Sequence, residues 1–476
     1  MLQNGQAGMD TGRNRFAEFE QKMRGAGLGQ AAIRAFRHNY ESLVAGQTGM
    51  YPENSIQPIS NLPRLETVRQ DRAPDACLLA QTAILKLNGG LGTSMGLEKA
   101  KSLLVVKDGL TFLDLIARQI LFLRHEHGVS LRFLLMNSYN TSSDTLGFLK
   151  AYPGLGNPKE LELLQSRAPK VDAETLRPAT WAPNPQLEWC PPGHGDIYPS
   201  LLGTGVLDQL LGAGVRFLFV SNADNLGASL DLSLLGYFAA SGNDFLMEVA
   251  ERTASDRKGG HLAQQDGRLL LRESSQCPET DQAAFQDIQR HRFFNTNNLW
   301  LRLDSLCELL QQHGGFLPLP MIKNAKTVDP RDKNSPRVFQ VETAMGAAIG
   351  CFRNAGAVVV PRTRFAPVKT TGDLLALRSD AYTVTKDWRL VLTNPSHAQP
   401  PTLDLDSEYY RLTDQLEAMT AQGAPSLKDC RELVVRGPVQ FHAGNVFRGT
   451  VKLTNRAAKA RPLPAGTYAD CVTDLG

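Results

Sequence analysis

Residues 86–102 read KLNGGLGTSMGLEKAKS and begin at the end of an apolar run, 83–87. An apolar run that ends in glycines predicts a strand followed by a loop at the edge of a sheet. The glycines let backbone N–H groups approach phosphate oxygens closely, and Lys99 and Lys101 add positive charge. The glycine spacing fits neither the Walker A loop nor the GxGxxG loop. The segment therefore indicates an anion site, with a plain strand-to-helix turn as the alternative.

Short apolar runs alternate with helical patterns from about residue 80 to 390. Thr111 and Asp114 have the spacing of a capping box, and the apolar positions after them predict a helix. Strand–helix alternation predicts an α/β fold whose mostly parallel sheet carries helices on both faces and binds ligands at its carboxyl edge. The predicted strands cover 83–87, 131–136, 216–220, 245–250, 299–303 and 357–360.

Several segments flank or interrupt this alternation. Residues 1–12 are rich in Gly, Gln and Asn and are predicted to be mobile, whereas 13–45 has the spacing of helices. Prolines predict that 153–196 is largely loop, and the basic, proline-containing stretch 313–337 is a second interruption. Both are expected to cover a site at the sheet edge. The segment 393–404 reads TNPSHAQPPTLD and predicts a linker.

Residues 431–456 alternate apolar and polar side chains, with glycines at short intervals. This pattern is consistent with the coils of a β-helix, and a pair of ordinary β-hairpins is the alternative. We therefore predict three parts: a mobile and helical segment over 1–45, a central α/β domain over 46–390, and a linker with a β-helix-like domain over 391–476.

The composition indicates a chain with a sizeable core and little net charge. Its 476 residues are 42% hydrophobic, and 51 Lys and Arg against 48 Asp and Glu leave a charge of +3. This balance argues against a broad cationic face for nucleic acid or for an anionic membrane. Seven cysteines are scattered without a CxxC pair, and no stretch has the pattern of a signal peptide or a membrane span. We expect a cytoplasmic protein in a reducing compartment.

Two further segments place polar side chains beside an apolar run or between glycines. Asp224 follows the predicted strand 216–220, with Asn222 and Asn225 beside it. One carboxylate at a strand end is sufficient for Mg²⁺, which takes other ligands from substrate phosphates, and an N-cap for the next helix is the alternative. His194 stands between two glycines in PPGHGD, where it is either held in a fixed place or solvated as an ordinary loop side chain.

Three polar residues stand in blocks beside other apolar elements. Asn298 lies in NTNNLW, Glu342 in QVETAMG and Lys369 in PVKTTGD. Amides and carboxylates suit a hydroxyl-rich sugar, which needs many paired donors and acceptors. Lys369 is a candidate for a phosphate site, with an exposed loop lysine as the commoner alternative.

Taken together, in this order and spacing, these segments resemble the UTP–glucose-1-phosphate uridylyltransferases of the eukaryotic type, also called UDP-glucose pyrophosphorylases. The resemblance covers about residues 80–385. Eight ordered blocks are far more specific than one glycine-rich loop. The blocks are KLNGGLGTSMG at 86–96, FLLMNSYNTSSDT at 133–145, PPGHGDIY at 191–198, FVSNADNLGASLD at 219–231, NTNNLW at 295–300, NAKTVD at 324–329, ETAMGAAIG at 342–350 and PVKTTGDLL at 367–375.

The resemblance implies a Rossmann-like nucleotidyltransferase core with N-terminal helices and a C-terminal left-handed β-helix, through which a homo-oligomer would form. It implies that Lys369 and Lys101 are the catalytic cations and that Asp224 binds Mg²⁺. The implied contacts to UTP are Leu87, Asn88, Gly89, Gly90, Gln165 and Gly193, the last two at the uracil. The implied contacts to the glucose phosphate and its hydroxyls are His194, Asn222, Ala223, Asp224, Asn298 and Glu342.

The implied reaction converts UTP and glucose 1-phosphate into UDP-glucose and pyrophosphate by in-line attack on the α-phosphorus of UTP. The attacking phosphate oxygen is already anionic, so the protein mainly has to hold and neutralise two polyanions. Ala100 departs from the family pattern, which usually has proline before the lysine, and the C-terminal coils are shorter and more divergent.

Two rival functions remain. One is a pyrophosphorylase that uses N-acetylglucosamine 1-phosphate or another sugar phosphate. The LNGG at 87–90 favours glucose, because the amino-sugar family more often has LAGG. The other rival is a non-catalytic nucleotide-sugar sensor, against which the retained charges of Lys101, Asp224 and Lys369 argue.

Overall fold

The computed structural model describes residues 15–71, 75–397 and 399–476. The chain divides into two compact units. The first holds the described residues of 1–85, 163–220 and 232–360, and the second holds those of 86–162, 221–231 and 361–476. The mobility predicted for residues 1–12 falls outside the described residues, and the domain boundaries predicted at 45 and 390 stay predictions.

A mixed sheet forms the centre of the first unit. β14 (Phe293–Arg302) lies between β10 (Phe217–Asn222) and β11 (Phe245–Glu251) and is antiparallel to both. β17 (Ala355–Val359) extends the sheet parallel to β11, and β2 (Thr82–Asn88) lies next to β10. The apolar side chains of β10, β11 and β14 are almost completely buried, so these strands form the core of this unit.

A smaller set of strands continues from β14. β12 (His261–Gln265) pairs with β14, and β13 (Arg268–Arg272) and β1 (Gln57–Pro58) pair with β12 in antiparallel fashion. The helices of this unit that follow or connect its strands are α3 (Leu65–Asp71), α6 (Ile197–Gly203), α7 (Val206–Gly212), α8 (Leu232–Ser241), α9 (Gln282–Gln286) and α10 (Leu303–Gln312).

The predicted α/β class is confirmed, together with its N-terminal helices. β11 and β17 pair in parallel as predicted, whereas β14 runs antiparallel to its neighbours. Strands occur at all six predicted places. The largest error concerns β14, which was predicted over 299–303 and begins at Phe293. Its first six residues include Asn295, Thr296 and Asn298, whose polarity hid the strand, although all three side chains are buried.

The N-terminal helices pack through aromatic side chains. One helix covers residues 15–25, and α2 covers Gln30–Val44. Phe16, Phe19, Phe36 and Tyr40 are buried together, with the ring centroids of Phe19 and Tyr40 4.7 Å apart. The predicted apolar stripes therefore form real packing surfaces within the first unit.

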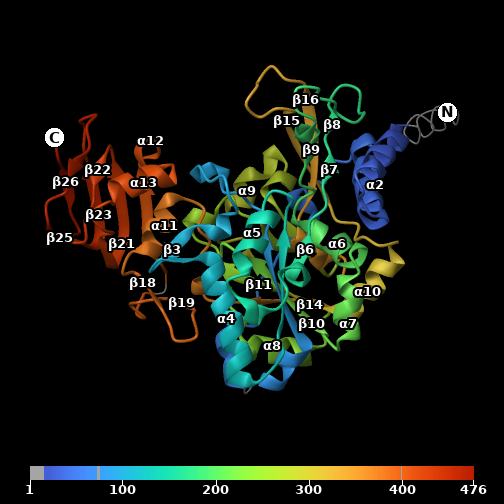
Figure 1. Ribbon diagram of the computed structural model, residues 1–476, viewed down its shortest axis with the longest axis horizontal. Helices are drawn as coiled ribbons and strands as arrows, with labels where there is room; N and C mark the ends of the chain where they lie inside the picture. The colour runs from blue at the N-terminus through green and yellow to red at the C-terminus, as the bar shows by residue number, and fades with distance from the viewer. Residues whose placement is uncertain (1–14, 72–74, 398) are drawn as a thin grey trace. The chain divides into compact units, whose positions relative to one another are not determined.

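Both predicted interruptions contain short strands. β15 (Met321–Thr327) pairs antiparallel with β16 (Arg337–Thr343), and β16 also pairs with β8 (Val171–Asp172), as Figure 1 shows. Most of 153–196 is irregular, apart from pieces such as β7 (Ala168–Pro169) and β9 (Trp189–Cys190). The stretch 313–337 is therefore partly a hairpin strand. That either segment covers a site stays a prediction.

A capping box begins the main helix of the second unit, α4 (Phe112–His127). The Thr111 hydroxyl accepts the N–H of Asp114 at 3.0 Å, and the Asp114 carboxylate accepts the N–H of Thr111 at 2.8 Å. The capping box read from the sequence is thereby confirmed. The unit also contains β5 (Arg132–Asn137), α5 (Ser142–Leu149), α11 (Thr371–Arg378), α12 (Ser407–Tyr410), α13 (Thr413–Met419) and the short strands β3 (Val105–Lys107), β4 (Leu110–Thr111), β18 (Tyr382–Val384) and β19 (Leu390–Leu392).

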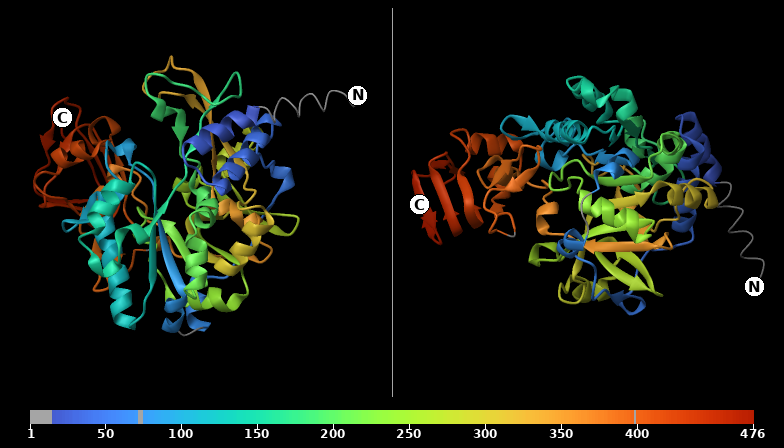
Figure 2. Two further views of the ribbon diagram at one scale, coloured as in Figure 1. Left: turned by 45° about the vertical axis from the view of Figure 1, so that its right-hand side comes forward. Right: turned by 90° about the horizontal axis from the view of Figure 1, so that it is seen from below.

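The C-terminal part of the second unit consists of parallel strands. Glu432 lies beside Thr450, and Lys452 lies beside Val472, so the chain returns to the same position after each turn. Figure 2 shows these strands in red near the C-terminus. They are β20 (Thr402–Leu405), β21 (Ser426–Arg436), β23 (Asn445–Thr454), β25 (Gly466–Ala469) and β26 (Val472–Asp474), with β22 (Val439–Gln440) pairing β24 (Arg461–Pro462) beside them.

The parallel pairing rules out the β-hairpin alternative, because hairpin strands are antiparallel. It agrees with β-helix-like coils, whose left hand stays a prediction. The predicted linker 393–404 overlaps the start of β20, and its residue 398 lies outside the described residues. No helix in the described ranges is long and apolar enough to cross a membrane.

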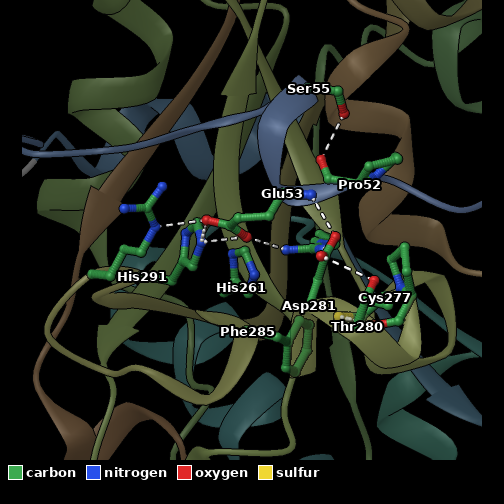
Figure 3. A network of polar contacts seen from close by, with 12 residues as sticks. Pro52, Glu53, Ser55, His261, Cys277, Thr280, Asp281, Phe285 and His291 are labelled. Carbon is green, nitrogen blue, oxygen red and sulfur yellow. Dashed lines mark hydrogen bonds and ion pairs between the residues drawn. The ribbon is translucent and has the colours of Figure 1, made fainter. Parts of the chain in front are cut away.

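A partly buried cluster of charged and aromatic side chains lies in the first unit beside β12 and β13. Glu53 accepts hydrogen bonds from Arg272 and Arg290, both at 2.6 Å, and from His291 at 3.0 Å (Figure 3). The ring of His261 stacks on that of His291, with their centroids 3.8 Å apart. Burial lowers the pKa of His291 despite the nearby carboxylate. Glu53 therefore balances positive charge from Arg290 and from the fully buried Arg272.

Candidate active site

The predicted site residues fall into two groups, one in each unit. The second unit holds Leu87, Asn88, Gly89, Gly90, Lys101, Asn222, Ala223, Asp224 and Lys369, and the first holds Gln165, Gly193, His194, Asn298 and Glu342. Within each group, residues from distant parts of the sequence come within hydrogen-bond distance of one another or of shared partners.

The end of β2 anchors the glycine-rich loop. Asn88 is buried, and its Nδ2 donates to Asn137 Oδ1 at 2.7 Å and to Thr145 Oγ1 at 2.9 Å. The carbonyl of Leu87 accepts the N–H of Ala223 at 2.9 Å, which joins the end of β2 to the residues after β10. The side chain of Asn88 therefore holds the loop in place, and its predicted contact to UTP stays a prediction.

The glycine-rich loop turns sharply back toward β2. Gly92 and Gly96 have φ values of 69° and 78°, a left-handed conformation that favours glycine. The carbonyl of Gly90 accepts the N–H of Lys101 at 3.1 Å, and the carbonyl of Gly89 accepts the hydroxyl of Ser138 at 2.9 Å. The glycines therefore bring Lys101 back beside the start of the loop.

Lys101 and Asp224 form an ion pair in the second unit. The distance from Lys101 Nζ to Asp224 Oδ2 is 2.7 Å, and the two side chains are 15% and 24% exposed. Lys101 Nζ also donates to the carbonyl of Val368. The N–H of Val368 donates to the carbonyl of Asp224 at 3.2 Å. Since such a pair is partly shielded from solvent, salt screens it less than an exposed ion pair.

Lys369 directly follows Val368 in the sequence and is exposed. Its backbone N–H donates to the carboxylate of Asp373 at 2.8 Å, and the same carboxylate accepts the N–H of Thr370 in the capping box of α11. The Nζ of Lys369 lies 5.6 Å from the centroid of the Phe365 ring. The backbone of Lys369 is therefore fixed, while its ammonium group lies at an accessible position.

Asp224 is the predicted metal ligand. Among the described residues, no group of three or more His, Cys, Asp or Glu side chains could hold a metal ion. Mg²⁺ often takes only one or two carboxylates and completes its shell with substrate phosphates and water. The carboxylate of Asp224 is partly exposed and already faces a cationic group, Lys101 Nζ. Its chemistry therefore fits Mg²⁺ when a phosphate ligand is also present.

In the first unit, Gln165 and Gly193 are joined directly. Gln165 Nε2 donates to the carbonyl of Gly193 at 2.9 Å. Gly193 has a φ of 81°, and a Cβ at this position would lie 2.4 Å from the carbonyl oxygen of Thr343. Only glycine fits so close to that backbone. The carboxylate of Asp196 ties the two segments together a second time by accepting the N–H of Ser166 at 2.7 Å.

His194 is held in one tautomer. The N–H of Met345 donates to His194 Nδ1 at 2.9 Å. Because a backbone N–H only donates, Nδ1 carries no proton in this arrangement and Nε2 carries it. Burial lowers the pKa of His194 to about 4. His194 is therefore a neutral ring with one N–H donor, which suits a phosphate or hydroxyl oxygen.

Asn298 and Glu342 lie at buried or half-buried positions of the first unit. Asn298 is fully buried, and its Nδ2 donates to the Glu248 carboxylate at 3.1 Å. The indole N–H of Trp300 donates to the other oxygen of that carboxylate at 3.0 Å. Burial raises the pKa of Glu342. Glu248 therefore orients Asn298, and the predicted contacts of Asn298 and Glu342 with sugar hydroxyls stay predictions.

Three residues that hydrogen-bond to the predicted site residues or to the segments beside them were not predicted as site residues. Asn225 could have been found, since it stands in the polar segment NADN after a strand. Asp196 lies two residues after His194 and offers a weaker signal. Glu248 interrupts an otherwise apolar strand, a pattern that indicates a buried partner without identifying it.

Comparisons with known proteins agree on one family. The sequence profile of the family described as UTP–glucose-1-phosphate uridylyltransferase matches residues 33–448. The chain is 39% identical to the UTP–glucose-1-phosphate uridylyltransferase of Solanum tuberosum, over 85% of this chain and 83% of that protein. It is 38% identical to the probable enzyme of Schizosaccharomyces pombe, over 83% of this chain and 77% of that protein.

Solved structures give the same result. A variant of the UDP-glucose pyrophosphorylase from Leishmania major, in complex with UDP-glucose, has a TM-score of 0.92 and 50% identity over 97% of this chain and 99% of that chain. The corresponding Trypanosoma brucei protein has a TM-score of 0.89 and 46% identity over 97% of this chain and 100% of that chain. The match extends over nearly the whole length of both structures.

Proposed function

This chain belongs to the UTP–glucose-1-phosphate uridylyltransferase family, and from that membership we propose that it converts UTP and glucose 1-phosphate into UDP-glucose and pyrophosphate. It is accordingly a nucleotidyltransferase. In the proposed reaction a phosphate oxygen of the sugar phosphate attacks the α-phosphorus of UTP in line, and the bond to pyrophosphate breaks. The attacking oxygen is anionic near neutral pH, so the protein needs no general base.

The observation that carries the proposal is the arrangement of Lys101, Asp224 and Lys369 in one unit. Lys101 lies 2.7 Å from Asp224, and the segment bonded to both leads directly into Lys369. Both cations are therefore attached to a fixed backbone before substrate arrives. Preorganised charge of this kind stabilises a transition state in which negative charge accumulates on phosphoryl oxygens.

Asp224 is the residue proposed to hold Mg²⁺. When bound there together with substrate phosphates, Mg²⁺ would neutralise phosphate charge and orient the reacting groups. Lys101 would then donate to phosphate oxygens, and Lys369 would stabilise the charge that develops at the α-phosphorus. The support for this assignment is the partly exposed carboxylate of Asp224 at the end of a strand.

The first unit is proposed to recognise the uracil and the sugar. Gln165 and the backbone of Gly193 would read the uracil, and their mutual hydrogen bond keeps both in place. His194 would donate its Nε2–H to the glucose phosphate. Asn298 and Glu342 would contact the sugar hydroxyls. For the second unit, we propose that residues 87–90 contact UTP and that Asn222 and Ala223 contact the glucose phosphate.

Pyrophosphate release from the full chain tests the proposal. The assay combines UTP and Mg²⁺ with glucose 1-phosphate, and parallel reactions substitute N-acetylglucosamine 1-phosphate, other sugar 1-phosphates or other nucleotides. We expect the highest kcat/KM with UTP and glucose 1-phosphate. A higher value with the amino sugar would assign the protein to the rival specificity. Binding of both substrates without any turnover would leave only the nucleotide-sugar sensor.

The substitution Asp224→Asn tests the metal assignment. Removing the charge should raise the Mg²⁺ concentration needed for half-maximal activity or abolish activity. The exposed Asp266→Asn on the β12–β13 turn serves as the control and should keep the parental Mg²⁺ titration. A parental Mg²⁺ titration for Asp224→Asn would remove Asp224 from the metal site.

The remaining predictions are also part of this proposal. A cytoplasmic location is supported by seven free cysteines. The near-neutral charge of +3 supports a protein without nucleic-acid or membrane partners. Self-association through the C-terminal coils and the three-part division at 45 and 390 complete the proposal.

A further inference from the structure

We infer that Asn225 is a positioning residue for Lys369, acting by fixing the backbone of residues 364–368. The inference rests on the proposed function, because it assigns to Asn225 a role in placing the catalytic cation of that reaction. All the contacts that support it lie within the second unit.

The carboxamide of Asn225 binds one N–H group and one carbonyl of the opposing backbone. Asn225 is 2% exposed. Its Oδ1 accepts the N–H of Ala366 at 3.0 Å, and its Nδ2 donates to the carbonyl of Arg364 at 3.1 Å. Asn225 also forms an isolated antiparallel bridge with Pro367. The side chain therefore adds two hydrogen bonds to a backbone pairing between the two segments.

The backbone at Gly227 lies too close to the backbone at Thr363 for any side chain to fit between them. A Cβ at Gly227 would lie 2.3 Å from the carbonyl oxygen of Thr363. The guanidinium of Arg364 donates to the carbonyl of Ser229 at 3.0 Å. The segment after Asp224 therefore contacts the segment before Lys369 at several residues. The side chain of Asn225 lies within this contact region.

Lys369 is consequently held from both sides. On its C-terminal side, its own N–H is bonded to Asp373. On its N-terminal side, Val368 is bonded to Asp224 and Lys101, and the residues before Val368 are bonded to Asn225. A displacement of a catalytic group by about 1 Å can cost about 10²-fold in rate. Removing the Asn225 carboxamide should therefore displace Lys369 and lower kcat.

The test is a double-mutant cycle on pyrophosphate release from the full chain with UTP, glucose 1-phosphate and Mg²⁺. We expect Asn225→Ala to lower kcat by about 10- to 10²-fold while the KM for UTP stays near the parental value. In the Lys369→Ala background, adding Asn225→Ala should change kcat less than about twofold, because residues that act as one unit are not additive. A merely structural role would instead lower kcat by the same factor in both backgrounds.

Asn455→Ala is the matched control. Asn455 is 3% exposed, donates to the carbonyls of Pro438 and Lys459 and accepts the N–H of Ala457. It therefore bridges backbone groups in the same way at the C-terminal coils, and its replacement should lower thermal stability without lowering kcat. Should Asn225→Ala not fold, Asn225→Asp keeps the acceptor for Ala366 and loses the donor to Arg364, so the same cycle is run with it.

Two outcomes would overturn the inference. One is a parental kcat for a folded Asn225 variant, and the other is additivity with Lys369→Ala. Either result requires an active parent protein. A parent that releases no pyrophosphate would instead contradict the proposed function, so the two failures are distinguishable.

Discussion

Lys101 and Asp224 neutralise each other at 2.7 Å, although they are 123 residues apart in the sequence. Each is also bonded to Val368, the residue before Lys369. The charges of Lys101 and Asp224 are therefore ordered before any substrate binds. Preorganisation of this kind removes the cost of orienting charged groups during the reaction.

Lys369→Ala tests the contribution of a single cation. We expect kcat to fall by about 10²- to 10³-fold, the effect of losing one preorganised donor to a transition state. Steady-state kinetics of pyrophosphate release provide the measurement. Lys428→Ala removes another exposed lysine, from β21, and should retain parental kinetics. A near-parental kcat for Lys369→Ala would exclude Lys369 from the catalytic role.

His194 should remain neutral throughout the physiological pH range. Its pKa is lowered to about 4 by burial, and the N–H of Met345 occupies Nδ1. Ring ¹⁵N signals, assigned by comparison with His194→Gln, should therefore be those of the Nε2–H tautomer from about pH 5.5 to 8. A histidine-containing peptide in the same sample, which titrates near about 6.5, calibrates the measurement. A His194 midpoint near that value would contradict the assignment.

Capping boxes fix the starts of two helices in the second unit. At α4 the box joins Thr111 and Asp114, and at α11 it joins Thr370 and Asp373. The two boxes share the pattern Thr-x-x-Asp. The second box has an additional role, because the same Asp373 carboxylate accepts the N–H of Lys369. Helix capping and the position of the Lys369 backbone are therefore coupled at α11.

Thr111→Ala tests the capping box of α4 without touching the proposed site. Losing the hydroxyl that accepts the N–H of Asp114 should lower the free energy of unfolding by about 1 kcal/mol. Urea unfolding measures this change, and kcat should stay parental. Thr111→Ser keeps the hydroxyl oxygen and should keep most of the stability. Equal losses for the alanine and serine variants would indicate that the methyl group, not the cap, is responsible.

The polar half of β14 illustrates what local patterns miss. Asn295, Thr296 and Asn298 read as a loop in the sequence, yet they are buried. Asn297 has a φ of 59°, and the pairing with β11 shifts at this point. The side chain of Glu248 on β11 satisfies the amide of Asn298. Such a segment becomes a strand only because its partner strand supplies hydrogen bonds to its side chains.

Both units are assembled from three separate stretches of the chain. In the first unit, Glu53 bonds to Arg272, Arg290 and His291, and the ring of His261 stacks on that of His291, so four places in the sequence meet in this cluster. Figure 3 shows Glu53, His261 and His291 within it. Burial, with His291 adding to it, lowers the pKa of His261 to about 2. The folded protein therefore holds His261 neutral at pH values where an unfolded chain would protonate it.

Stability should decrease as the pH falls below about 6.5, the ordinary histidine value. Below that pH the unfolded chain takes up a proton at His261 and the folded chain does not. Each such histidine lowers the free energy of unfolding by up to about 1.4 kcal/mol per pH unit. Asp196, whose pKa burial raises to about 6, acts in the opposite direction, because its folded form takes up a proton first.

The substitution His261→Leu separates the contribution of His261 to this pH dependence from that of Asp196. His261→Leu should show a shallower fall in unfolding free energy between about pH 6.5 and 4 than the parent, as measured by urea titration at each pH. The control Leu262→Ala removes a buried side chain from the same strand, and should lower stability by the same amount at every pH. A parental pH slope for His261→Leu would show that His261 does not contribute to it.

Much of this architecture was predictable because it depends on short-range patterns. Strands occur at all six predicted places, and the helix that follows Thr111 was predicted from its cap. The family was recognisable from eight ordered blocks, and the comparisons confirm it. The order of blocks along the chain identifies a family without revealing which side chains meet.

Periodicity, capping residues and glycine-rich turns concern neighbours within a few residues, so the amino-acid order alone was enough to establish an α/β protein of this family. Folding in three dimensions decided that Lys101 pairs with Asp224, that Asn225 bonds to Ala366, and that Gly193 lies against Thr343. These contacts join segments more than a hundred residues apart. Their hydrogen bonds form only after separate strands and loops have packed, so no local pattern encodes them.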